Sequence, residues 1–287
     1  MRPYNFAGLS KEFANPETAR IVILPVAYDA TVTFKSGARE GPRAIIAASQ
    51  ELEYYDEETD YEVYRLGIAT LPELTPVTSS PRDMLNKVKS TALFWLSQGK
   101  FIVMLGGEHL LTLGMVEAHA AQDSEFSVLH LDAHADLRLE YEGTPYSNAC
   151  VMRLVWEHVP VVSAGIRALS REEAEFIRER NLPVFSAMEV KKNLVNVIEN
   201  ILANLKDKVY LTIDLDCFDS GQMPAVGTPE PGGLDWYEVL AIVKAVAEKK
   251  RIIGFDVMEL CPQAGLVAPD FLAARLVYKL LSYIFAP

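Results

Sequence analysis

Cysteine is scarce in this chain. Only three are present among 287 residues, Cys150, Cys217 and Cys261, and no pair of them has the CxxC spacing of a zinc finger. Three widely separated thiols also argue against a disulfide framework. We therefore interpret them as small buried hydrophobic side chains.

Long apolar runs are also missing. Half of the residues are hydrophobic, but no segment reaches the roughly 18 consecutive apolar residues of a membrane-spanning helix. The first residues, MRPYNFAGLSKEF, contain no apolar core of a secretory signal peptide. We therefore expect a soluble, cytoplasmic protein with no membrane partner.

Positive charge is in short supply as well. The 27 lysines and arginines are outnumbered by 39 aspartates and glutamates, which gives a formal net charge of −12. Nucleic acids and anionic membranes bind surfaces on which lysine and arginine are clustered, so the composition argues against both partners. A small cationic ligand fits this acidic chain better.

Strand-like and helix-like segments alternate along the chain. No linker rich in glycine, serine or proline divides them, so we expect a single domain over residues 1–287. Nearly continuous hydrophobic runs predict strands at residues 21–27, 63–71, 101–107, 126–132, 159–167, 182–187, 209–216 and 251–260. Amphipathic segments predict helices at residues 82–98, 171–181, 194–205, 236–249 and 271–285. The pattern predicts an α/β fold in which helices cover both faces of a parallel sheet.

Histidines and aspartates lie where three of these strands end. The segments are GGEH (106–109), LHLDAHAD (129–136) and TIDLD (212–216). Residues two apart in an extended strand point the same way, so the alternating acids of each segment are expected to converge. Taken singly, each aspartate would more often be a cap or turn residue. Together the segments supply six candidate metal ligands, namely His109, Asp132, His134, Asp136, Asp214 and Asp216.

Four carboxylates at one edge of a sheet require positive charge nearby, because a desolvated charge without a partner costs several kcal/mol. Two divalent cations supply it. Mixed carboxylate and imidazole ligands favour Mn²⁺, Zn²⁺ or Fe²⁺ over Ca²⁺, and other divalent ions remain open because availability in the cell also decides the metal. We expect two Mn²⁺ ions.

Six segments together resemble the ureohydrolase family, which contains the arginases and agmatinases, and agmatinase-like members are the most similar. They are SGAREGPRAI (36–45), GGEH (106–109), DAHAD (132–136), DLDCFD (214–219), GTPEPGGL (227–234) and DVMELCP (256–262). The resemblance implies a three-layer α/β/α sandwich with a central, mostly parallel eight-stranded sheet. It also implies two Mn²⁺ ions that activate water, and a homo-oligomer, either a trimer or a hexamer.

The resemblance assigns the ligands to two ions. One ion takes His109, Asp132, Asp136 and Asp214, and the other takes Asp132, His134, Asp214 and Asp216. In this assignment Asp136 also orients the attacking hydroxide, while Asp216 and Glu259 hold the guanidinium group of the substrate. For Glu259, the open alternative is a surface acid or a charge at the start of a helix.

One position departs from the family pattern. Agmatinase-like proteins commonly have a histidine in a Tyr-Ser-His-Ala context, whereas this chain has Asn148. That histidine is thought to move protons or to position the substrate, and asparagine cannot titrate near neutral pH. Asn148 still offers hydrogen bonds to a substrate, or it caps the following helix. Among the other histidines, His130 is the best candidate for a hydrogen-bonding role behind the metal ligands.

The leading functional hypothesis is hydrolysis of agmatine to putrescine and urea, a reaction of polyamine biosynthesis. The alternatives are a related ureohydrolase with another guanidino substrate, such as guanidinobutyrate or arginine, and a slow or non-catalytic metal-binding protein. The usual arginase pattern of serine, asparagine and histidine after the aspartate motif is absent, which argues against arginine. Only Asn148 favours the non-catalytic reading.

Overall fold

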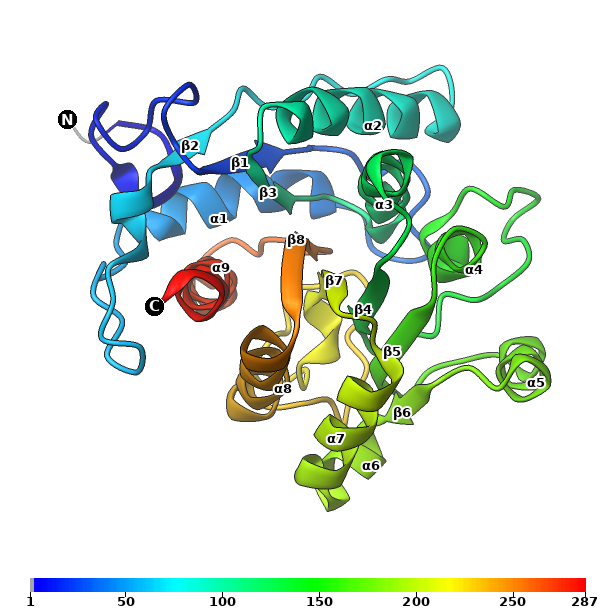
Figure 1. The fold of residues 1–287 in the computed structure, drawn as a ribbon. Helices are drawn as coiled ribbons and strands as arrows, with labels where there is room; N and C mark the ends of the chain where they lie inside the picture. Colours follow the sequence, from blue (N-terminus) through cyan, green and yellow to red (C-terminus); the bar gives the residue numbers. More distant parts are fainter. Residues whose placement is uncertain (1–2) are drawn as a thin grey trace.

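A computed structural model describes residues 3–287, and a parallel eight-stranded sheet forms its centre (Figure 1). The spatial order of the strands is β2-β1-β3-β8-β7-β4-β5-β6, and every adjacent pair is parallel. The strands are β1 (Ile21–Pro25), β2 (Ile68–Thr70), β3 (Phe101–Leu105), β4 (Ser127–Leu131), β5 (Val161–Ile166), β6 (Val184–Ser186), β7 (Lys208–Asp214) and β8 (Arg251–Met258).

Helices cover both faces of the sheet, as the hydrophobic strands predict. One core lies between the sheet and α1 (Gly41–Ser49), α6 (Ala187–Lys192), α7 (Leu194–Asn204), α8 (Trp236–Lys249) and α9 (Ala268–Phe285). The other lies beneath α2 (Pro81–Ser97), α3 (Thr112–Gln122), α4 (Val151–Trp156) and α5 (Arg171–Arg180). Figure 1 shows the two helical layers with the sheet between them, so the predicted three-layer α/β/α architecture is confirmed.

All eight predicted strands are present, each somewhat shorter than its predicted range, and in two of them the structure shows why. The first half of residues 63–71 is a 3₁₀ helix, Val63–Leu66, because Gly67 at φ 79° turns the chain before β2. The last strand ends at Met258, because Glu259 has a φ of 65°. A residue in the left-handed region cannot continue an extended strand.

The amphipathic pattern of the sequence does not predict every helix. All residues of α3 from Thr112 to His119 are buried, so its polar and apolar positions do not alternate with a helical period. The predicted helix starting at Arg171 begins with a reciprocal pair of hydrogen bonds between Ser170 and Glu173. None of the helices within residues 3–287 is both long and apolar enough to cross a bilayer.

The strand order determines which segments meet. The four central strands are β3, β8, β7 and β4, and the segments that carry the candidate metal ligands and Glu259 follow these four strands. Because all strands are parallel, their carboxyl ends lie at the same edge of the sheet. Segments separated by as many as 150 residues in sequence, such as His109 and Glu259, are thereby brought into hydrogen-bond contact.

Candidate metal and substrate site

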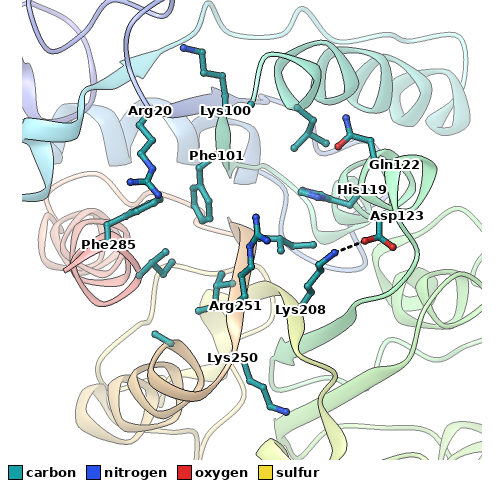
Figure 2. Close-up of a pocket in the computed structure, with 16 residues that line it drawn as sticks. Arg20, Lys100, Phe101, His119, Gln122, Asp123, Lys208, Lys250, Arg251 and Phe285 are labelled. Atoms are coloured by element: carbon teal, nitrogen blue, oxygen red, sulfur yellow. Dashed lines mark hydrogen bonds and ion pairs between the residues drawn. The ribbon is translucent and has the colours of Figure 1, made fainter. Parts of the chain in front are cut away.

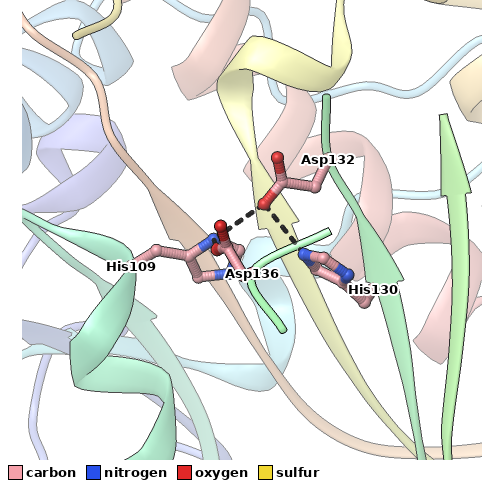
Figure 3. Close-up of side chains that lie close together, drawn as sticks. All are labelled: His109, His130, Asp132 and Asp136. Carbon is pink, nitrogen blue, oxygen red and sulfur yellow. Dashed lines mark hydrogen bonds and ion pairs between the residues drawn. The ribbon is translucent and has the colours of Figure 1, made fainter. Parts of the chain in front are cut away.

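His109 lies among three of the predicted acidic ligands. Its Nδ1 atom is 3.0 Å from Asp132 Oδ2, 3.2 Å from Asp214 Oδ2 and 3.5 Å from Asp136 Oδ2. Figure 3 shows the side chain of His109, from the segment after β3, pointing toward those of Asp132 and Asp136, from the segment after β4. The ring and the three carboxylates are all buried.

The hydrogen bonds behind His109 determine its protonation. Thr212 Oγ1 donates to Asp256 Oδ1 at 2.5 Å, so it accepts from His109 Nε2 at 2.8 Å. The proton of the neutral ring therefore sits on Nε2, and Nδ1 presents a lone pair to the carboxylates. Asp256 also accepts from Thr112 and from Tyr210, so both oxygens of this buried carboxyl group are engaged.

A lone pair facing three carboxylates requires a positive charge between them. Nδ1 of His109 has no hydrogen-bond partner, although it is buried. Without a cation, the adjacent acids raise the pKa of His109 well above its usual value despite its burial, because a second proton on the ring would then balance them. A divalent cation meets the same need, so the donor set fits a metal ion.

His134 and Asp216 form a second group with the other oxygen of Asp132. His134 Nδ1 is 2.9 Å from Asp216 Oδ2 and 3.5 Å from Asp132 Oδ1. One ligand atom from each of these three residues fits within 4.8 Å of the others, the spacing of groups that could hold an ion. Asp132 thus offers one oxygen to each group.

Burial and mutual repulsion act on the acids together. Burial, followed by the charges of neighbouring aspartates, raises the pKa of Asp136 and of Asp214 well above the usual range. Asp132 behaves oppositely, because the surrounding histidines outweigh the cost of burial and lower its pKa. In the absence of metal the cluster therefore holds protons, which bound cations would displace.

The loop after β4 brings its three ligands together in an unexpected way. The strand ends at Leu131, and Asp136 has a φ of 53°, so Asp132, His134 and Asp136 do not lie on one extended strand. Likewise Asp216 lies in a 3₁₀ helix, Leu215–Cys217, that follows β7. The two-residue spacing predicted the grouping, but the extended backbone assumed for it was wrong.

Glu259 lines the same cavity as the metal ligands. Its Oε1 atom accepts a hydrogen bond of 2.7 Å from the backbone amide of His109, at the start of a 3₁₀ helix that leads into α3. Burial raises the pKa of Glu259 to about 8. Glu259 is thus a buried cavity residue and not a surface acid, and it also accepts from the start of a helix; its predicted contact with the guanidinium group stays a prediction.

Asn148 also lines the cavity, but it does not cap a helix. Its Oδ1 accepts from the amide of Ala149 at 3.0 Å and from the hydroxyl of Ser147 at 3.1 Å, and Ser147 is the residue before the short helix. The capping interpretation is therefore wrong. His119 and His158 do not line this cavity, so neither can replace the missing histidine.

Several residues that support the ligands were not singled out from the sequence. Thr212 and Asp256 orient His109, as described above, and Ser163 on β5 lies opposite His130 on β4. The His130 ring bonds Asp132 Oδ2 at 2.8 Å and Ser163 Oγ at 3.0 Å, which agrees with the supporting role expected for His130. Thr212 could have been found from the sequence, because it stands two residues before Asp214 in the same alternating pattern as Asp214 and Asp216.

The ligands open into a cavity of about 300 Å³ with an acidic wall. Beyond the metal cluster it is lined by Glu173, Glu230 and Glu259, by Arg138, and by the less polar side chains of Tyr141 and Leu169. Arg167 holds the segment around Glu230 in place, since its guanidinium donates to the carbonyl oxygens of Glu230 and Asp216 at 2.8 and 2.7 Å. Among the described residues, nothing pairs with the Glu230 carboxylate.

Comparisons with known proteins identify the family of this fold and site. The model of the arginase family matches residues 19–282. A relative in Synechocystis sp., named N(1)-aminopropylagmatine ureohydrolase, is 42% identical over 98% of this chain and 96% of its own. The agmatinase of Bacillus subtilis is 31% identical over 86% of this chain and 85% of its own. The crystal structure of agmatine ureohydrolase from Thermoplasma volcanium superposes with a TM-score of 0.89 at 30% identity, covering 99% and 95% of the two chains. This chain therefore belongs to the arginase family of hydrolases, in agreement with the resemblance seen in its motifs.

Proposed function

We propose that this protein hydrolyses the guanidino group of a linear polyamine, N(1)-aminopropylagmatine in preference to agmatine, and releases urea. The observation that carries the proposal is the acidic cavity that joins the ligand cluster to the unpaired carboxylate of Glu230. The sequence alone favoured agmatine. The similarity to a named N(1)-aminopropylagmatine ureohydrolase exceeds that to a named agmatinase, and it moves the proposal to the longer substrate.

Two divalent ions, Mn²⁺ in our proposal, would be held by the six residues that both the spacing and the resemblance indicate. A bound pair of this kind lowers the pKa of a shared water, so that hydroxide is present near neutral pH. In the two clusters described above, Asp132 faces His109 on one side and His134 on the other. In this proposal Asp136 would orient the attacking water, and Asp214 would be one of the ligands that hold the ions.

The substrate's guanidinium is a planar cation, and we assign its binding to Asp216 and Glu259. Both carboxylates line the cavity beside the cluster, and charge-assisted hydrogen bonds to N–H groups suit them. Hydrolysis adds water to the guanidinium carbon and breaks its bond to the alkyl nitrogen. That nitrogen leaves as an amine and needs a proton, which Asn148 cannot supply from its own side chain but can guide by hydrogen bonding.

The far end of the cavity suits a cationic chain. Tyr141 and Leu169 offer apolar surface to methylene groups, and Glu230 offers a carboxylate to an ammonium group. Apart from the two histidines of the ligand cluster, Arg138 is the one basic residue in this wall, and its charge is offset by Glu173, whose Oε2 lies 4.0 Å from the Arg138 Nε. A substrate with an amino tail therefore meets more favourable charge here than one with a carboxylate tail.

Urea release tests the proposal directly. The protein would be purified with Mn²⁺ and supplied separately with N(1)-aminopropylagmatine, agmatine, guanidinobutyrate and arginine. We expect the highest kcat/KM with N(1)-aminopropylagmatine. A preference for guanidinobutyrate would instead mean that Arg138 reads the tail, and no urea from any of the four would overturn the assignment.

A further inference from the structure

A second cavity of about 430 Å³ lies at the opposite edge of the sheet, where the strands begin (Figure 2). Its charge is the reverse of that of the substrate cavity. Five basic residues line it, Arg20, Lys100, Lys208, Lys250 and Arg251, against a single carboxylate, Asp123. This concentration of positive charge contrasts with the net charge of −12 of the whole chain.

The basic residues come from four strands that are neighbours in the sheet. Arg20 and Lys100 directly precede β1 and β3, which pair in register from Ile21 and Phe101 onward. Lys208 and Arg251 are the first residues of β7 and β8, and they are paired with each other. Like charges on adjacent strands are destabilising, so this arrangement needs a negative partner.

Helix ends supply part of that negative charge. The last turns of α2, α3, α8 and α9 all reach this cavity, and each helix C-terminus carries roughly half a negative charge. Lys100 donates to the carbonyl oxygens of Glu17 and Ala19, Lys250 donates to that of Leu205, and Lys208 pairs with Asp123, so these three lysines have structural partners. Five cations and one carboxylate leave four positive charges, of which four helix ends offset about two. About two positive charges remain.

The floor of the cavity holds an unsatisfied polar group. His119 is buried, it lines the cavity, and its Nε2 atom has no hydrogen-bond partner. Figure 2 shows its ring on the side of the cavity that also carries Gln122 and Asp123, across from Phe101. A buried polar nitrogen without a partner costs about 1 to 3 kcal/mol, and a ligand oxygen would relieve that cost.

We propose that this cavity binds a small phosphate-bearing anion. A phosphate dianion matches the residual charge of about two, accepts hydrogen bonds from Arg251 and Arg20, and can satisfy His119. Arg251 is exposed and has no partner among residues 3–287, while Arg20 lies over the ring of Phe285, 4.6 Å from its centroid. These two side chains are therefore available to a ligand. Phe101 and Phe285 add aromatic surface that suits a nucleoside attached to the phosphate.

Calorimetric titration of the Mn²⁺-loaded protein with inorganic phosphate, and separately with AMP, tests the proposal. We expect saturable binding that the double variant Arg20→Gln/Arg251→Gln weakens at least tenfold. Asp123→Asn removes the only carboxylate in the wall and should tighten binding several-fold. Tighter binding of AMP than of phosphate would identify a nucleotide as the ligand, and equal binding would identify free phosphate.

A matched control is Arg178→Gln/Lys192→Gln, which removes two exposed cations from α5 and α6, away from the cavity. This control should bind both probes like the unmodified protein. Phosphate that binds the metal centre instead would be unaffected by the Arg20 and Arg251 substitutions. Unchanged binding in that double variant, an equal loss in the control, or no saturable binding at all would overturn the proposal.

Discussion

Two site residues hold backbone conformations that side chains rarely adopt. Asp136 and Glu259 both have positive φ values, 53° and 65°, although neither is a glycine. Such conformations cost of order 1 kcal/mol or more and persist where the surroundings enforce them. Here the strained backbone turn at each residue directs its carboxylate back toward His109. The same conformation that costs free energy therefore places the side chain in the site.

Asn148 is the position where restoring a titratable group should change the rate. We predict that Asn148→His raises kcat for urea release by about tenfold or more, because an imidazole beside the leaving amine can deliver a proton. General acid catalysis typically contributes roughly 10²- to 10⁴-fold. The measurement is kcat with the best substrate from pH 6 to 9, with Asn148→Gln as the non-titrating control. An equal rate for both variants would show that another group supplies the proton.

Glu230 tests how the tail of the substrate is bound. We predict that Glu230→Gln raises KM for N(1)-aminopropylagmatine about tenfold with little change in kcat, because the removed charge contacts the tail and not the reacting carbon. Guanidinobutyrate, which lacks the ammonium tail, serves as the control substrate and should lose no affinity. A fall in kcat for both substrates would place Glu230 in the chemistry instead.

At the level of strands and helices, the sequence predicted which segments form strands, but it did not predict the order of those strands in the sheet. The eight hydrophobic runs predicted the strands because residues covered on both faces show no polar alternation. The grouping of His109 with Asp132 and Asp214 followed from the shared carboxyl edge. The order of the strands could not be predicted from the sequence, because it depends on how the helical connections between strands pack against the sheet. Asp256 was missed for the same reason, since it meets Thr212 only once β7 and β8 are adjacent, whereas Thr212 itself could have been found from its two-residue spacing to Asp214.

That adjacency yields a prediction about metal affinity. Thr212→Val keeps the shape of the side chain but removes the oxygen that accepts from His109 Nε2. We predict that Mn²⁺ affinity falls about 10- to 100-fold, the usual effect of losing a group that orients a metal ligand. Competition with a chelator measures it. The control is Thr91→Val, whose hydroxyl bonds only Lys87 within α2, and equal Mn²⁺ affinity in both variants would exclude a positioning role for Thr212.

Over the whole molecule, charge is separated along the strand direction. The carboxyl edge of the sheet carries the buried acids, and the opposite edge carries the basic cavity with His119 on its floor. Composition gave the net charge but could not reveal this separation, because Arg20, Lys100, Lys208 and Arg251 become neighbours only through the sheet order. Both edges contain buried groups whose protonation differs from that in the unfolded chain.

His119 provides a test of that difference. Burial lowers its pKa to about 4, whereas an unfolded histidine titrates near 6.5. Between these values the unfolded chain binds a proton that the folded protein excludes, so stability falls as the pH falls through this window. The shift corresponds to at most about 3 kcal/mol. We predict that His119→Phe, which can keep the ring contacts with Phe126 and Tyr210, loses correspondingly less stability between pH 7 and pH 4.5.

Urea-induced unfolding at the two pH values measures the effect for each variant. The buried acids of the metal cluster also titrate on acidification, but they are common to both proteins, so the comparison between variants isolates His119. The same substitution at the partly exposed His158 controls for loss of a histidine as such. Equal losses of stability on acidification for His119→Phe and the unmodified protein would contradict the prediction. They would mean that the folded protein does not keep the His119 ring neutral, so the ring must be accessible to solvent in the native state.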